Sequence, residues 1–188
     1  NNSLALCSDQ VYSRGIYINT SNVAIDCQNA IFQSNDGLLN GFFIENADNV
    51  KISNCTFKNF KGNIAVRNYR RSGINPLTQR PVDFSQLGED ASSLYDKDDP
   101  RTYGYAPLDN IVLNNVKVLN NEGGTLMRIQ NSTIKNSVFD GGGLGFYLEA
   151  DSHHNLITHS IFSNSTAREG LILDGAYENT VTNNKVFN

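Results

Sequence analysis

The sequence has no tryptophan, one methionine and four prolines among its 188 residues, and 18% of its residues are charged. The charged share of an average protein is about a quarter. No apolar run approaches the roughly 20 residues of a membrane-spanning helix, so we predict no span. The net charge is −4 and no basic stripe is present, so the phosphate contacts of a nucleic-acid-binding protein are missing. The sequence therefore predicts that the chain has no membrane-spanning helix and does not bind nucleic acid.

Asparagine, in contrast, is in large excess, with 27 occurrences. Its side chain competes with the helix backbone for hydrogen bonds, whereas it suits turns and stacked amide ladders. The excess therefore indicates β-structure rather than helices. The length is enough for one domain with its own core. No signal peptide opens the chain and the sequence stops in mid-pattern, so we expect a fragment of a longer protein.

Six short segments lead into an alternating apolar pattern: GIYIN (15–19), GFFIE (41–45), NIAVR (63–67), GTLMR (124–128), GFYLE (145–149) and GLILD (170–174). Alternation at period two predicts a strand in each segment. The second and fourth residues share one face, which we expect to point inward: Ile16/Ile18, Phe42/Ile44, Ile64/Val66, Thr125/Met127, Phe146/Leu148 and Leu171/Leu173.

A second strand type recurs in NVKISNCTF (49–57), NIVLNNVKV (110–118), NSTIKNSVF (131–139), HNLITHSIF (154–162) and NTVTNNKVF (179–187). These starts are 21 to 25 residues apart, with one gap of 61. The fourth position holds Ile52, Leu113, Ile134, Ile157 and Thr182. The sixth position holds Asn54, Asn115, Asn136, His159 and Asn184, and the ninth holds Phe57, Val118, Phe139, Phe162 and Phe187.

This period, with short strands and no helical pattern, predicts coils of a β-solenoid. Coils about 4.8 Å apart would stack equivalent residues into ladders. In this pattern the chain resembles the right-handed parallel β-helices of the pectin-lyase-like superfamily. The resemblance implies an all-β, single-stranded, right-handed parallel β-helix of six to seven coils. It would form one domain over residues 1–188, interrupted by a loop insertion at 68–109.

The predicted insertion is rich in proline, tyrosine and charge and shows no strand or helix pattern. Loops of this length in compact domains are functional or disordered. Tyr95, Tyr103 and Tyr105 give the segment apolar mass, which favours order, and a solvated loop is the competing interpretation. The resemblance implies that such an excursion walls a substrate groove.

Cys7 and Cys27 follow similar segments and are twenty residues apart, about one coil. Neighbouring stacked positions would bring them within disulfide range. A Cys7–Cys27 bridge would indicate a secreted, periplasmic or cell-surface protein. The alternative is three buried thiols. Cys55 has no partner in the predicted bridge and is expected to be buried.

The other side of the first strands should face solvent. Its third residues are Tyr17, Phe43, Ala65, Leu126, Tyr147 and Ile172, and its fifth residues are Asn19, Glu45, Arg67, Arg128, Glu149 and Asp174. Aromatic rings can pack on sugar rings, and Arg can hold a uronate carboxylate through two hydrogen bonds. Tyr17, Phe43, Glu45, Tyr103 and Tyr105 are therefore the candidate substrate-binding residues. The candidate catalytic residues are Arg67, Arg128, Tyr147, Glu149 and Asp174.

Glu149 and Asp174 would lie one coil apart, where like charges push one pKa up and give the acid and the base that glycoside hydrolysis needs. The same two carboxylates also suit a calcium ion. The competing interpretation is that the column forms ordinary cross-strand ion pairs, such as Arg128–Glu149.

The stretch that holds Glu149, Asp151, His153, His154 and His159 has several interpretations. A zinc site needs three converging ligands, and His159 should lie on a different strand from His153. Tyr147, Asp151 and His153 resemble the Tyr-Gly-Phe-Asp-Pro-His signature of mannuronan C5-epimerases, but Ser152 replaces the proline and Tyr147 is one residue too far from Asp151. The favoured interpretation is a plain turn, and we predict no metal site here.

Two classes of function follow. The first is an extracytoplasmic protein that acts on an acidic, uronate-containing polysaccharide by lyase, epimerase or hydrolase chemistry. That chemistry requires a base, an acid and a cation that neutralises the uronate, with Arg67 and Arg128 as the clamps. The second is a non-catalytic glycan-binding, adhesive or tail-spike-type β-helix. The pattern makes no prediction of the oligomeric state.

Overall fold

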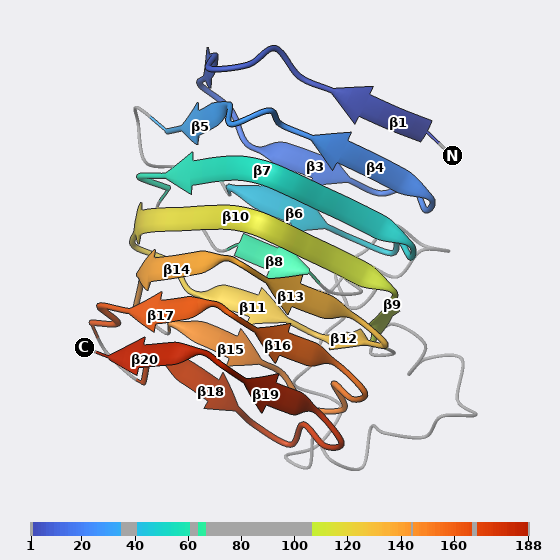
Figure 1. Cartoon of the computed structure of the whole chain (residues 1–188), viewed down its shortest axis with the longest axis vertical. Coiled ribbons are helices and arrows are strands. Elements are labelled where there is room, and N and C mark those ends of the chain that lie inside the picture. Colours follow the sequence, from blue (N-terminus) through green and yellow to red (C-terminus); the bar gives the residue numbers. More distant parts are fainter. Residues whose placement is uncertain are drawn as a thin grey trace, which may run out of the picture.

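The fold is a β-solenoid of about six turns, built from strands without helices in the part of the chain that the structure describes. The structure is a computed structural model, and it describes residues 2–34, 41–60, 64–66, 107–143, 145–166 and 169–187. The strands stack in parallel from the N-terminal to the C-terminal end (Figure 1). Within these ranges, no helix is long and apolar enough to cross a membrane.

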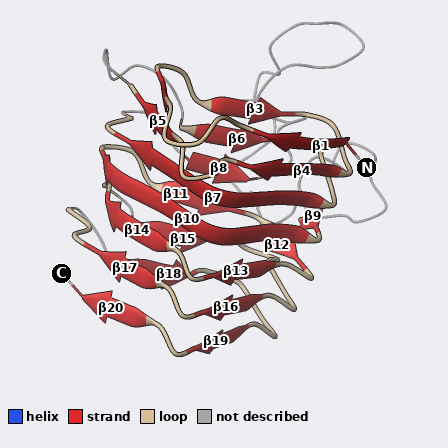
Figure 2. Ribbon diagram, turned by 45° about the horizontal axis from the view of Figure 1, so that its top comes forward, coloured by secondary structure: helices blue, strands red, loops and turns tan. Residues whose placement is uncertain are grey.

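Two sheets form the walls (Figure 2). Sheet A is twelve-stranded and contains two rows that share two long strands, β7 (Val50–Lys58) and β10 (Ile111–Asn121). The first row adds β1 (Asn2–Ala5), β4 (Val23–Asp26), β13 (Thr133–Lys135), β16 (Leu156–Thr158) and β19 (Thr180–Thr182). The second row adds β2 (Val11–Tyr12), β5 (Ile31–Gln33), β14 (Val138–Gly141), β17 (Ile161–Ser163) and β20 (Lys185–Phe187).

Sheet B is six-stranded and is built from the six short segments of the first strand type. Its strands, in spatial order, are β3 (Ile16–Ile18), β6 (Phe42–Ile44), β8 (Ile64–Val66), β11 (Thr125–Met127), β15 (Phe146–Leu148) and β18 (Leu171–Leu173). A short pair, β9 (Leu108–Asp109) with β12 (Ile129–Gln130), completes the strands. The strand β9 occupies the last two residues of the predicted insertion, and residues 68–106 lie outside the described part.

The core lies between the two sheets and consists of stacked like residues, as the repeat predicts. Ile52, Leu113 and Ile134 are in register on adjacent strands and have no exposed surface. Phenylalanines stack in the same way, with ring centroids 4.9 Å apart for Phe32–Phe57 and 5.4 Å apart for Phe139–Phe162. Each coil therefore buries its apolar face against its neighbours, because one coil alone has nothing to cover it.

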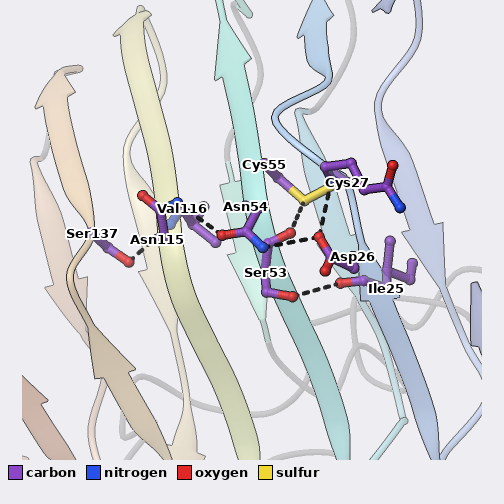
Figure 3. Close-up of a disulfide and its surroundings, with 10 residues drawn as sticks. Ile25, Asp26, Cys27, Ser53, Asn54, Cys55, Asn115, Val116 and Ser137 are labelled. Carbon is purple, nitrogen blue, oxygen red and sulfur yellow. Dashed lines mark hydrogen bonds between the residues drawn. A yellow bond between two sulfur atoms is a disulfide. The ribbon is translucent and has the colours of Figure 1, made fainter. Parts of the chain in front are cut away.

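The bends between strands depend on asparagine in the left-handed conformation. Asn54, Asn115 and Asn136 occupy equivalent bend positions with φ of 55°, 55° and 53°. Asn adopts this conformation more readily than most residues. The amides also bond between coils: Asn115 Nδ2 donates to Asn54 Oδ1 at 2.8 Å, and Asn54 Nδ2 donates to Asp26 Oδ1 at 3.0 Å (Figure 3). The predicted asparagine ladder is present here, although Asn136 donates to Asn114 instead of Asn115.

The last coil differs from the predicted register by one residue. Val181, and not Thr182, lies opposite Ile157, while Val186, and not Phe187, lies opposite Phe162. Asn183 consequently takes the left-handed bend position that was assigned to Asn184.

The side chain of Asn184 turns instead into a buried row of hydroxyls. Its Oδ1 accepts from the backbone N–H of Ser160 at 2.8 Å, just as Ser160 Oγ accepts from the N–H of Ser137.

The predicted disulfide is wrong. Cys27 bonds to Cys55, with Cα atoms 5.0 Å apart (Figure 3). Cys7 is a free, exposed thiol. Ala5 lies opposite Asp26, so Cys7 comes one residue past the position opposite Cys27, and an offset of one residue turns a side chain to the other face. Cys27 directly follows Asp26, which lies opposite Ser53, and the chain has two more residues between Asp26 and Ile31 than between Ser53 and Thr56. At this irregular bend both cysteine side chains are buried, and they bond to each other.

Candidate functional site

The outward face of sheet B is the candidate site, and its third-residue column has the predicted register. Tyr17 lies beside Phe43, and Tyr147 lies between Leu126 and Ile172. The column is open at its N-terminal end, where Tyr17 is 59% exposed and its ring stacks on Phe43 at 6.0 Å. It is closed in the middle, where Ala65 and Leu126 are 1% and 9% exposed. Aromatic surface is therefore accessible at Tyr17 and less so toward the centre of the face.

The fifth-residue column is also formed as predicted. The backbone N–H of Glu45 donates to the carbonyl of Ile18, and the same bond joins Arg128 to Val66, Glu149 to Met127 and Asp174 to Leu148. Each fifth residue thus follows its sheet B strand and hydrogen-bonds to the preceding coil. Arg128, Glu149 and Asp174 lie on successive coils. Tyr147 joins them through Asp174, so the structure brings together four of the five predicted catalytic residues.

Two tyrosine–carboxylate pairs link the columns across coils. The Tyr17 hydroxyl donates to Glu45 Oε2 at 2.5 Å, and the Tyr147 hydroxyl donates to Asp174 Oδ2. In both pairs the tyrosine is a third residue, and the carboxylate is the fifth residue of the next coil. The bond to the Glu45 carboxylate raises the pKa of Tyr17, because it stabilises the protonated phenol. Asp174 is thus paired with Tyr147, a partner that the sequence analysis did not assign to it.

Three of the predicted site residues, Arg67, Tyr103 and Tyr105, lie outside the described part of the chain. The remaining substrate-binding candidates, Tyr17, Phe43 and Glu45, form one contiguous group through the ring stack and the hydroxyl–carboxylate bond. The residue pattern predicted the third-residue and fifth-residue columns, but it did not predict the tyrosine–carboxylate pairs that link them across coils. A usable signal is present, since the acid follows the tyrosine by 28 residues in the first pair and by 27 in the second.

The histidine segment forms the bend between sheet B and sheet A. His154 is in register with Asn131 and takes the left-handed conformation of the bend asparagines, as the turn interpretation predicts. His153 stacks on Tyr177 with centroids 5.0 Å apart and planes 2° apart, and His154 Nε2 lies 3.1 Å from Glu178 Oε2. Glu178 takes the bend position that the pattern assigned to Asn179.

Within the described ranges, no group of three or more His, Cys, Asp or Glu side chains is arranged to hold a metal ion. The His segment nevertheless supplies two neighbouring imidazoles, and His153 Nδ1 donates to the Asp151 carbonyl at 2.7 Å. His159 lies elsewhere, with its Nδ1 2.8 Å from Thr158 Oγ1.

Stacked parallel coils, stapled by a disulfide, define this chain as an extracytoplasmic parallel β-helix repeat protein. The comparison with protein families agrees: the model of the periplasmic copper-binding protein (NosD) family matches residues 1–188. The chain therefore belongs to the NosD family, and its location is secreted or periplasmic. No curated protein and no solved structure gave a significant match.

Proposed function

We propose that this β-helix binds a sugar chain along the outward face of sheet B. The observation that supports the proposal is the recurrence of the tyrosine–carboxylate pair, Tyr17–Glu45 and Tyr147–Asp174, on one face. An exposed ring can pack on a sugar ring, and a carboxylate beside it can accept hydrogen bonds from the sugar hydroxyls.

The spacing of the two pairs suits an extended ligand. The strands β3 and β15 are four steps apart in sheet B, which corresponds to about 19 Å at the strand spacing of about 4.8 Å. Ala65 and Leu126 lie between the two pairs and are 1% and 9% exposed, so a sugar chain that contacts both pairs must pass over this closed middle of the column. A monosaccharide cannot contact both pairs. The proposed ligand is therefore a chain of several sugar units.

The charges of the face narrow the ligand further. Among the described residues of the fifth-residue column, Glu45, Glu149 and Asp174 are acidic and Arg128 is basic. A densely charged polyuronate would meet this acidic excess, so a neutral or sparsely charged chain is favoured. The chemistry on uronates expected from the sequence remains a prediction, with Arg128, Tyr147, Glu149 and Asp174 as its residues and Arg67 as the proposed second clamp.

Titration of the protein with neutral and uronate oligosaccharides, followed by calorimetry, tests the proposal. Tyr17→Ala should weaken binding about fivefold, which corresponds to about 1 kcal/mol of ring stacking. Tyr177→Ala is the matched control, because Tyr177 is an exposed tyrosine outside sheet B and should bind like the wild type.

Two results would contradict the proposal: equal affinities of Tyr17→Ala and the wild type, or no binding of any sugar chain. Absorbance of an unsaturated product during incubation with uronate polymers would instead support the lyase version of the function.

Copper binding is the second candidate function, because the family is described as copper-binding. One observation favours it here: His154 Nε2 lies 3.1 Å from Glu178 Oε2, with His153 adjacent. Imidazole is a ligand that copper prefers, so the donor chemistry fits. These side chains would hold the ion at the exposed bend between the sheets.

A further inference from the structure

The outward face of sheet A carries all five lysines of the described residues: Lys51 and Lys58 on β7, Lys117 on β10, Lys135 on β13 and Lys185 on β20. Each is adjacent in sequence to a residue of an inward-facing column, as Lys51 is to Ile52 and Lys117 is to Val118. Figure 1 shows these four strands on the same side of the molecule. The sequence shows no basic stripe, because the lysines are spread over residues 51–185 and only the stacking of the coils brings them onto one face.

Few carboxylates offset these lysines. The strands of sheet A contain two acidic residues, Asp26 on β4 and Asp140 on β14, so positive charge is in excess on this face. Asp26 Oδ1 accepts from Asn54 Nδ2 at 3.0 Å, and Asp140 Oδ1 accepts from Ser163 Oγ at 2.7 Å. Within the described ranges, none of the five lysines forms an ion pair with a carboxylate. Their ammonium groups therefore keep their charge for a partner of opposite sign.

The two outward faces of the solenoid carry opposite charge. On sheet B, the described part of the fifth-residue column has three acids and one arginine, whereas sheet A has five lysines and two aspartates. The positive face exists although the chain as a whole has a net charge of −4. A surface with charge of one sign attracts and orients a partner of the other sign, so sheet A suits an anionic ligand.

The spacing of the lysines suits a ligand with repeated anionic groups. Lys58 lies opposite Leu119, two residues beyond Lys117 on the adjacent strand, so the Cα atoms of the two lysines are roughly 8 Å apart. Lys117 and Lys185 share one column and are three strand steps apart, or about 14 Å. A single small anion reaches the neighbouring pair at most, whereas a polymer with a carboxylate on successive units can contact all three lysines.

Shape and location favour a polysaccharide over a membrane or a nucleic acid. The long strands β7 and β10 bend at Asn54 and Asn115, so Lys51 and Lys135 lie on the first row and the other three lysines lie beyond the bend. A flat membrane would meet the lysines of one row, whereas a flexible polymer can follow the bend. The secreted or periplasmic location places the chain among extracytoplasmic polymers.

We propose that the outward face of sheet A binds an acidic polysaccharide, whose uronate carboxylates are held by the ammonium groups of its lysines. This surface is separate from the sugar site proposed on sheet B and does not depend on it. Each contact is a charge-assisted hydrogen bond at the protein surface, so affinity comes from several weak contacts on one polymer and is screened by salt.

Fluorescence anisotropy with an end-labelled polygalacturonate oligosaccharide tests the proposal. Between about 50 and about 200 mM salt the affinity should fall by up to about 100-fold if all five lysines take part, given a slope of about 0.7 per contact for single-stranded polyanions. A lysine close to an anionic surface contributes about fivefold in affinity. Lys117→Gln should therefore weaken binding about fivefold, and the double variant Lys58→Gln/Lys117→Gln about 25-fold. Glutamine keeps most of the side-chain length, so the fold should be retained.

Arg14→Gln is the matched control, because it removes one positive charge from an exposed residue between β2 and β3, outside sheet A. It should bind polygalacturonate like the wild type. Equal affinities of the double lysine variant and the wild type would overturn the site, as would no binding of polygalacturonate at about 50 mM salt.

Two further ligands test the choice of partner. Tighter binding to phosphatidylglycerol vesicles, or to single-stranded DNA with the same number of charges, would overturn the assignment to a polysaccharide. Tyr17→Ala should leave the binding of polygalacturonate unchanged, and Lys117→Gln should leave the binding of neutral oligosaccharides unchanged. A failure of the sheet A surface can thus be distinguished from a failure of the site proposed on sheet B.

Discussion

Reduction of the Cys27–Cys55 disulfide should destabilise the N-terminal coils by several kcal/mol. The two residues are 28 positions apart, so the bridge closes one full coil. The loop-closure relation gives about 12 cal/mol/K for a loop of about 29 residues, or about 3.6 kcal/mol at 25 °C. Both cysteines are buried, so comparing oxidised with reduced wild-type protein isolates the cross-link without changing the core volume.

Urea unfolding with and without reductant measures this difference, and hydrogen exchange locates it. Because a solenoid is stabilised by nearest-neighbour contacts, faster exchange should concentrate in β4, which Cys27 directly follows, and in β7, which contains Cys55. A difference below about 1 kcal/mol would refute the argument that loop closure stabilises these coils.

Thiol counting tests the connectivity itself. In denaturant without reductant, the wild type should show one reactive thiol and the Cys7→Ser variant none. Two thiols in Cys7→Ser would mean that Cys7 is bridged to Cys27 after all.

The remaining predictions concern the core and a bend. Phe146→Ala should lower the free energy of unfolding by about 3–5 kcal/mol, because Phe146 is fully buried and packs edge-on against Phe139 and Phe162. Urea unfolding measures this, and a loss below about 1 kcal/mol would contradict the stacked core. Hydrogen bonds from Asn54 and from the backbone of Gln28 lower the pKa of Asp26, so its ionised form stabilises the fold. The wild type should be more stable than Asp26→Asn by its full margin above about pH 5, and this margin should vanish as the pH falls through the lowered pKa of Asp26. Thermal unfolding of both proteins at stepped pH measures the margin. A margin that does not change with pH would exclude ionised Asp26 as its cause.

Repeat periodicity predicted the architecture because the same physical condition recurs in every coil. Residues such as Ile52, Leu113 and Ile134 must be apolar to fill the space between the sheets, and this requirement is visible in the sequence. The same alternation predicts the third-residue and fifth-residue columns on the outward face of sheet B. The sequence alone was therefore enough to place Arg128, Glu149 and Asp174 on one face.

Bend lengths could not be predicted in this way. A bend can gain or lose a residue at little cost, as at Gln28 and Asn29, and each such change alters which side chains meet. The repeat pattern did not show this irregular bend, so it did not predict that Cys27 pairs with Cys55. The terminal coil shows the same effect: Asn183 and Asn184 are adjacent and chemically identical, so the pattern did not show which of them forms the bend.

The site residues that the sequence missed are those that pair across coils. Tyr17–Glu45 joins the third residue of one coil to the fifth of the next, and a search within single repeats does not find it. His154–Glu178 was missed because the shifted register placed Asn179 opposite His154. Once the register is known, both pairs follow from the stacking.

Because the core consists of stacked columns of like residues, the number of coils in such a molecule can change during evolution. Each coil meets its neighbours through the same aliphatic, aromatic and amide positions, so duplication of a 23-residue unit such as 132–154 would insert a compatible layer and lengthen the solenoid by about 4.8 Å. The cross-section would stay constant while a new row of outward side chains became free to diverge. Tandem duplication can therefore extend such a surface without redesigning its interior.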